Sequence, residues 1–189
     1  ITINYDKAPR IPTVHMGSRT TSYILRGVST PKTSFDKAFR EDHWFNISAI
    51  DVFDLTAKSI AIIGNSITDG KNSTNNAQNR WPDILSESSQ KKHGVTDVGI
   101  LNLGIGNNRV TLTGGFGFMA RKRFDHDILL QRGVRTVVIF EGVNDIGATP
   151  NNKVEAVTND LIQSYEEMIR KAKERNFRVF LGTISPFKG

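Results

Sequence analysis

The chain has 189 residues, of which 38% are hydrophobic and 23% are charged, with a net charge of +6 and no cysteine. These values indicate a globular protein with a sizeable core. They exclude a disordered chain, a disulfide framework, a thiolate metal site and a cysteine nucleophile. No apolar run approaches the length of about 18 residues that a membrane-spanning helix needs, so we expect no membrane span.

The basic charge is spread along the chain, with local groups at 121–123 ("RKR") and 170–175 ("RKAKER"). The second group ends a predicted helix, where cations suit the helix dipole. We therefore interpret the charge as a solvent-exposed face and expect no nucleic-acid partner. A protein that binds nucleic acid or another anionic ligand is the weakest of the functional alternatives.

Residues 1–57 are rich in loops and show only short extended segments, such as 21–25 ("TSYIL") and 44–53 ("WFNISAIDVF"). In the second segment apolar and polar residues alternate in part, which favours a strand. We predict that residues 1–57 form a β-type N-terminal segment, the remnant of an accessory region.

From residue 58 onward, apolar runs typical of buried strands alternate with segments typical of helices. The predicted strands are 59–64, 98–104, 135–142 and 177–183, and the predicted helices are 80–94, 118–131 and 153–175. The last helix carries one apolar stripe, formed by Val154, Val157, Leu161, Tyr165, Met168 and Ala172. The alternation predicts an α/β domain over 58–189, a three-layer α/β/α sandwich with a parallel sheet and right-handed crossovers.

Binding sites in such sheets lie beyond the carboxyl ends of the strands. The four turns at those ends are 64–70 ("GNSITDG"), 104–108 ("GIGNN"), 141–145 ("EGVND") and 184–189 ("ISPFKG"). All four contain Gly, Asn, Ser or Asp. The topology therefore predicts that distant polar residues become neighbours, namely Ser66, Asn107, Asn108, Asn144 and Asp145.

The glycine-rich turns do not match the common phosphate-binding loops. The spacing from Gly64 to Gly70 is one residue too long for a Walker A loop, and Arg109 stands where a dinucleotide fingerprint needs a small residue. None of the four histidines has a second histidine or a cysteine at metal-ligand spacing. We expect neither a cofactor nor a metal.

Ser66 permits two interpretations, since Gly, Asn, Ser and Asp are also the ordinary residues of turns. As a nucleophile, it needs a base and donors aimed at the developing oxyanion. The Ser66 N–H, a backbone N–H of the turn after the second strand and the Asn144 amide can supply three such donors from three strand ends. That combination favours the nucleophile over the turn residue.

"GNSITDG", "NLGIGNN" and "GVND" resemble, in this order, the first three blocks of the SGNH, or GDSL-type, hydrolase family. Further segments resemble a bacterial branch that acts on acylated carbohydrates or small esters: "HWFNISAIDV", "NRWPDIL", "ARKRFDHDIL", "GVRTVVIFEGVNDIG" and "GTISPFKG". Together the segments cover most of residues 43–189. The resemblance implies a flavodoxin-like hydrolase fold.

The resemblance also implies roles for the matching residues. Ser66 is expected to be the nucleophile, and its N–H, the Asn107 N–H and the Asn144 amide are expected to form the oxyanion hole. Gly106 is the alternative donor if the second block aligns one residue earlier. Asn65 departs from the Asp that the family usually has there, and Asn107 departs from a favoured glycine.

The family places an Asp-x-x-His arrangement after its last strand, and none of the four histidines, His15, His43, His93 and His126, lies at that place. We expect the triad His and Asp beyond Gly189, together with a last strand and helix. Their segment could act as a separate partner chain. The 189 residues alone are then expected to be inactive, and residues 177–183 would form a bare apolar edge.

The leading hypothesis is a serine esterase that hydrolyses acetyl or other short-chain esters, with a small ester or an acylated carbohydrate as substrate. Its substrate class suggests a secreted or periplasmic protein. The alternative is a non-catalytic carbohydrate-binding or scaffolding domain derived from the same fold.

Overall fold

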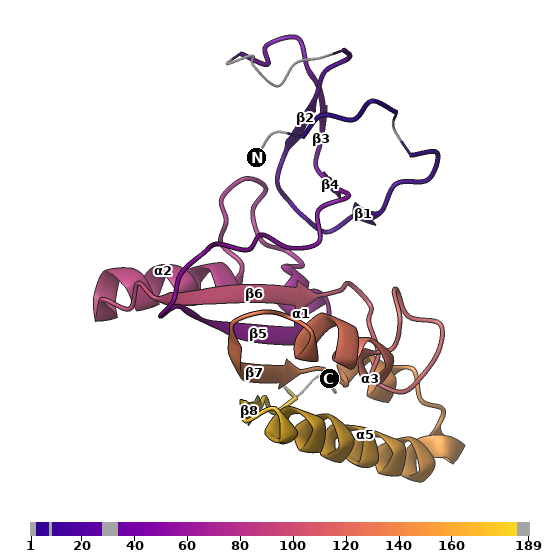
Figure 1. The fold of residues 1–189 in the computed structure, drawn as a ribbon. Coiled ribbons are helices and arrows are strands. Elements are labelled where there is room, and N and C mark those ends of the chain that lie inside the picture. Colours follow the sequence, from indigo (N-terminus) through magenta and orange to yellow (C-terminus); the bar gives the residue numbers. More distant parts are fainter. Residues whose placement is uncertain (1–2, 8, 28–33, 185–189) are drawn as a thin grey trace.

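The computed structural model describes residues 3–7, 9–27 and 34–184 (Figure 1). A group of short N-terminal strands lies beside the β6 edge of a parallel sheet that is flanked by helices. The predicted turn 184–189 lies outside the described residues except for Ile184. The predicted division between 57 and 58 stays a prediction.

Four parallel strands form the sheet in the order β6-β5-β7-β8. They are β5 (Lys58–Gly64), β6 (Val98–Gly104), β7 (Val134–Phe140) and β8 (Arg178–Leu181). Gly64, the last residue of β5, pairs with Gly104 on one side and with Phe140 on the other. The carboxyl ends of three strands are therefore level at one edge of the sheet, as the sequence predicted.

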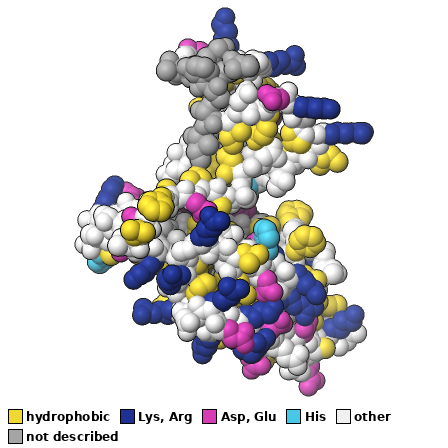
Figure 2. Space-filling view, viewed as in Figure 1, with side chains coloured by type: hydrophobic (Ala, Val, Ile, Leu, Met, Phe, Trp, Pro, Cys, Tyr) yellow, Lys and Arg dark blue, Asp and Glu magenta, His cyan; other side chains and the backbone are white. Residues whose placement is uncertain are grey.

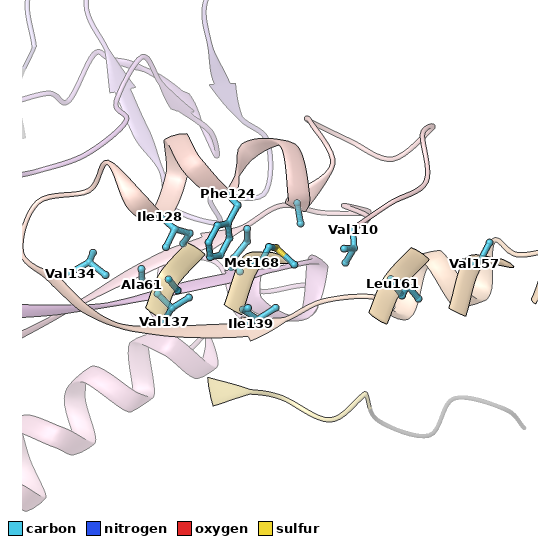
Figure 3. Close-up of a cluster of buried hydrophobic side chains, with 13 residues drawn as sticks. Ala61, Val110, Phe124, Ile128, Val134, Val137, Ile139, Val157, Leu161 and Met168 are labelled. Atoms are coloured by element: carbon cyan, nitrogen blue, oxygen red, sulfur yellow. The ribbon is translucent and has the colours of Figure 1, made fainter. Parts of the chain in front are cut away.

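Helices cover both faces of the sheet. The helical elements of the domain are α1 (Ser66–Asp69), α2 (Trp81–His93), α3 (Ala120–Phe124), the π-helical turn η1 (Asp125–Leu129), α4 (Val143–Gly147), the 3-10 turn η2 (Asn151–Lys153) and α5 (Val154–Glu174). Figure 3 shows the main hydrophobic cluster between the sheet and the layer formed by α3, η1 and α5. Helix α2 packs on the opposite face, where the Trp81 ring meets Phe140 edge-on with centroids 6.4 Å apart. The three-layer α/β fold is confirmed.

The core follows the predicted periodicities. Ala61 and Ile63 of β5 enter the main cluster, whereas Ile62 between them is buried outside that cluster. In α5, the predicted stripe is buried at Val157, Leu161, Met168 and Ala172. No helix in the described ranges is long and apolar enough to span a membrane.

The predicted helix 118–131 differs in detail. It consists of α3 followed by the wider turn η1, in which the Leu130 N–H reaches the Asp125 carbonyl at 3.1 Å. Phe124 and Ile128, on either side of this junction, are both fully buried. The apolar pattern predicted where the helical segment lies. It did not predict the extra residue in the turn of η1, because that turn depends on which side chains face the core.

The N-terminal segment contains short antiparallel strands: β1 (Val14–His15) pairs with β4 (Trp44–Phe45), and β2 (Ser22–Ile24) with β3 (Phe39–Glu41). The predicted strand 44–53 is wrong beyond Phe45. Val52 and Phe53 are 79% and 95% exposed, and no described strand pairs with residues 46–53. Alternation alone produces no strand where no neighbouring edge accepts the hydrogen bonds.

Candidate active site

Ser66 begins the turn that follows the central strand β5. The side chain of Asn65, which caps α1, accepts a hydrogen bond from the Ile67 N–H at 3.0 Å. Ser66 is partly exposed, and no residue in the described part of the chain forms a hydrogen bond with its hydroxyl. The hydroxyl is therefore accessible at the carboxyl end of β5.

The turn after β6 offers two candidate N–H donors, and their surroundings differ. The Gly106 N–H donates to Oδ2 of Asp69 at 3.1 Å. The Asn107 N–H has no acceptor among the described residues, and Asn107 has a φ of 53°, a left-handed conformation that Asn tolerates well. Of the two groups, only the Asn107 N–H is left for a ligand.

Asn144 lies in α4, directly after β7. Its Nδ2 donates to the carbonyl oxygen of Asn108 at 2.9 Å, and its second amide hydrogen is available because an amide nitrogen carries two. Gly142 caps α4 with a φ of 109°, and a Cβ there would lie 2.2 Å from the Tyr165 hydroxyl. This position therefore requires glycine.

Asp145 binds the segment that follows the second turn, the turn at 104–108. Its fully buried carboxylate accepts hydrogen bonds from the N–H groups of Val110, Thr111 and Leu112 at 2.8, 2.9 and 3.0 Å, and from the Thr111 hydroxyl at 3.1 Å. Such a carboxylate fixes backbone rather than reacting, because its lone pairs are occupied. Asp145 thus joins the third turn to the chain that leaves the second.

Asn108 and Arg123 form a buried support beneath the turns. The Asn108 Oδ1 accepts from Arg123 Nε at 3.1 Å, and the Asn108 amide donates to the carbonyls of Phe116 and Phe118 at 2.7 and 2.9 Å. Arg123 also donates to the carbonyls at the ends of both β5 and β6.

We interpreted "RKR" as a solvent-exposed face; for Arg123 this was wrong, since the residue is only 5% exposed. Arg123 stands four residues before Asp127 on the predicted helix, a spacing typical of an ion pair. This spacing was the signal in the sequence that Arg123 has a partner in the protein.

Glu141 is a buried carboxyl at the start of the turn 141–145. No role for this residue was predicted from the sequence. It is 2% exposed, and burial raises its pKa to about 8. Its Oε2 accepts from the Gly142 N–H at 3.2 Å, its Oε1 has no hydrogen-bond partner among the described residues, and the neighbouring Asn65 side chain partly offsets the rise in its pKa. The neutral amide of Asn65 avoids a second carboxyl beside Glu141, which is a physical reason for the departure from the family's usual Asp.

None of the four histidines bonds to Ser66, and three of them contact other groups. The Nε2 of His15 lies 2.5 Å from Oδ1 of Asp69, although the sequence placed His15 in the N-terminal segment with no partner. His126 pairs with Asp127 at the surface, and His43 contacts the Met16 carbonyl. His93 ends α2. Among the described residues, no group of three His, Cys, Asp or Glu side chains is arranged to hold a metal ion.

A hollow of about 160 Å³ lies next to the second turn. It is lined by Asn108, Arg109, Leu112, Phe116, Phe118 and Met119, among others. Phe116 and Phe118 are 66% and 79% exposed, and the Phe116 N–H donates to the Asn107 carbonyl at 3.3 Å. Two exposed aromatic side chains therefore lie beside the second turn, and the backbone of one of them, Phe116, bonds to the residue that carries the candidate donor.

The fold resembles those of solved SGNH-type proteins. The crystal structure of AlinE4, an SGNH-hydrolase family esterase, matches with a TM-score of 0.53 and 17% identity, over 69% of this chain and 61% of that one. A carbohydrate acetylesterase family member from Sinorhizobium meliloti matches with a TM-score of 0.50 and 14% identity, over 66% of this chain and 61% of that one. The chain thus spans about three fifths of the length of each. A search of curated protein sequences gave no match.

At the level of sequence, residues 62–189 match the family described as GDSL-like lipase/acylhydrolase. The matched range contains the three turns that carry Ser66, Asn107 and Asn144. The resemblance inferred from the sequence is confirmed: the chain belongs to the GDSL-like lipase/acylhydrolase family.

Proposed function

We propose that the protein is a serine esterase in which Ser66 is the nucleophile. One observation carries the proposal. Three groups lie at the ends of three adjacent strands: the Ser66 hydroxyl and the Asn107 N–H, which have no hydrogen-bond partner among the described residues, and the Asn144 amide, which uses one of its two hydrogens. A hydroxyl next to neutral donors fits acyl transfer, where negative charge develops on a carbonyl oxygen. Membership of an acylhydrolase family supports the same chemistry.

In the proposed reaction, Ser66 Oγ attacks the ester carbonyl carbon while a base takes the hydroxyl proton. The resulting oxyanion accepts hydrogen bonds from the N–H groups of Ser66 and Asn107 and from the Asn144 amide. The ester C–O bond then breaks, the alcohol leaves with the proton, and water hydrolyses the acyl-enzyme to the acid. These donors act on the transition state because they are already fixed by neighbouring turns.

The base is proposed to be a histidine of an Asp-x-x-His arrangement beyond Gly189. No described histidine bonds to Ser66, and His15, His43 and His126 contact other groups. Replacing that histidine by alanine should abolish turnover while Ser66 stays in place. A gene that encodes no such arrangement after Gly189 would favour the second candidate, a non-catalytic carbohydrate-binding domain.

The proposed substrates are acetyl or other short-chain esters on a carbohydrate. This is supported by the resemblance to the carbohydrate-active branch and by the exposed Phe116 and Phe118 beside the second turn. Acetate release from an acetylated xylo-oligosaccharide should exceed acid release from a long-chain p-nitrophenyl ester. The reverse preference would contradict the substrate class while leaving the esterase chemistry intact.

The direct test uses the intact protein, with the proposed base, and compares the wild type with Ser66→Ala and with Ser86→Ala, a serine of α2 outside the turns. We expect labelling by a fluorophosphonate probe and hydrolysis of p-nitrophenyl acetate in the wild type and in Ser86→Ala, and neither in Ser66→Ala. Equal activity in all three proteins would remove Ser66 from the mechanism.

A further inference from the structure

The carboxylate of Asp69 connects three segments of the chain. Its Oδ2 accepts from the Gly106 N–H of the second turn at 3.1 Å, and its Oδ1 lies 2.5 Å from His15 Nε2 of the N-terminal segment. Asp69 itself ends α1, the helix that Ser66 begins. Each carboxylate oxygen therefore contacts a different segment, and both segments are held against the helix of the nucleophile.

The contact with the N-terminal segment is close and specific. A Cβ at Gly17, two residues after His15, would lie 2.3 Å from Asp69 Oδ2, so only glycine permits this approach. Asp69 is 8% exposed and the His15 side chain is 37% exposed. Figure 2 shows the N-terminal segment above the sheet domain, with a notch between the two at the right of the view.

The Asp69 contact also decides which N–H of the second turn is left for a ligand. Because Asp69 occupies the Gly106 N–H, the Asn107 N–H is the one without an acceptor in the described ranges. Ser66 and Asp69 lie in one helical turn, so the hydrogen bond fixes the second turn relative to the nucleophile. Hydrogen bonds to a charged acceptor are stronger than neutral ones, which suits this task.

We propose that Asp69 is a positioning residue that orients the turn at 104–108, which carries the proposed oxyanion donor Asn107. We propose further that His15 holds Asp69 in place, so that the N-terminal segment completes the active site. This inference rests on the proposed esterase function. Arg80 also contacts Asp69, but it donates through Nε to the backbone carbonyl at 3.0 Å and not to the carboxylate. His15 is therefore the side chain that contacts the carboxylate itself from the N-terminal segment.

The test measures kcat and KM for p-nitrophenyl acetate in Asp69→Ala, Asp69→Asn, His15→Ala and His126→Ala. Misplacing a catalytic group by about 1 Å can cost 10²-fold in rate, so Asp69→Ala should lower kcat up to about 10²-fold with little change in KM. Asp69→Asn retains an oxygen for the Gly106 N–H and an amide for His15, and should recover most of the activity. His15→Ala should lower kcat about 2- to 10-fold, the effect of one hydrogen bond.

His126→Ala is the matched control, because His126 also pairs with a carboxylate but its side chain is 81% exposed and distant in sequence from the turns. It should leave kcat unchanged. Equal kcat in the wild type, Asp69→Ala and His15→Ala would overturn the proposal, provided that Ser66→Ala is inactive. An Asp69→Asn protein as slow as Asp69→Ala would also overturn it.

Amide hydrogen exchange at Gly106 tests the same contact in the absence of turnover. Asp69→Ala and His15→Ala should accelerate exchange at Gly106, and Asp69→Asn should preserve its protection. Unchanged exchange in both alanine variants would refute the role of Asp69 whether or not the protein hydrolyses esters. Accelerated exchange in a protein without Ser66-dependent hydrolysis would support the positioning contact and reject the proposed function instead.

Discussion

Glu141 gives the sharpest prediction about stability, because its carboxyl is only 2% exposed and accepts one hydrogen bond, from the Gly142 N–H. Burial raises its pKa from 4.5 to about 8. The folded protein therefore keeps the Glu141 proton up to about pH 8, whereas the unfolded chain releases it above pH 4.5. Since the folded state binds the extra proton, the free energy of unfolding falls as the pH rises through this interval.

The size of the effect follows from the two pKa values. Each pH unit between 4.5 and about 8 removes about 1.4 kcal/mol, which amounts to about 5 kcal/mol over the whole interval. The contribution of Glu141 is fully present below pH 4.5 and is lost above pH 8. Glu141→Gln replaces the protonated acid by a neutral group of the same shape and removes this pH dependence.

The assay is urea unfolding at pH 5, 7 and 9, followed by the fluorescence of Trp81, whose ring contacts Phe140 next to Glu141. At pH 5 the wild type and Glu141→Gln should differ by less than about 1 kcal/mol. At pH 9 the variant should be more stable by several kcal/mol. Titration of the histidines cancels in the difference between the two proteins.

Glu87→Gln is the control, since the hydrogen bond from Lys91 lowers the pKa of Glu87 below 4.5 and so below the measured range. Its difference from the wild type should not change between pH 5 and 9. A wild-type minus Glu141→Gln difference that is also constant over this range would refute the argument. It would mean that Glu141 is ionised in the folded protein at neutral pH.

Four further predictions concern the turns and the core. Asn144→Ala should lower kcat by about 10²–10³-fold in the p-nitrophenyl acetate assay, because it removes one proposed oxyanion donor, and should cost about 1 kcal/mol in urea unfolding, because it removes the bond to the Asn108 carbonyl. Tyr165→Phe removes the 2.9 Å bond to the Glu141 carbonyl and should cost about 1 kcal/mol in urea unfolding. Asp145→Ala leaves three buried N–H groups without an acceptor and should accelerate hydrogen exchange at 110–112. Met168→Ala should cost about 2–5 kcal/mol, since Met168 is 1% exposed in the main cluster; a loss below 1 kcal/mol would contradict that packing.

The order of strands and helices and the convergence of the turns could be read from the sequence. Buried parallel strands require continuous apolar runs, and the carboxyl ends of such strands meet at one edge, so Ser66, Asn107 and Asn144 were identified together. The predicted strand 98–104 has the bounds of β6, and the other predicted strands differ from the structure by at most two residues at either end. Local periodicity is sufficient for these features because each depends on neighbours in the chain.

Other features depend on contacts between distant residues and required the tertiary structure. Lys122 is exposed and Arg123 is buried, although both belong to one basic run, because only Arg123 faces the carbonyls at the strand ends. His15 lies far in sequence from Asp69, its partner. The choice between Gly106 and Asn107 depends on that same carboxylate, which takes one N–H and leaves the other. The sequence by itself determined which residues could carry the chemistry. The tertiary structure decided which of their donors are still free, because a hydrogen-bonding group is available to a ligand only where the fold has not already used it.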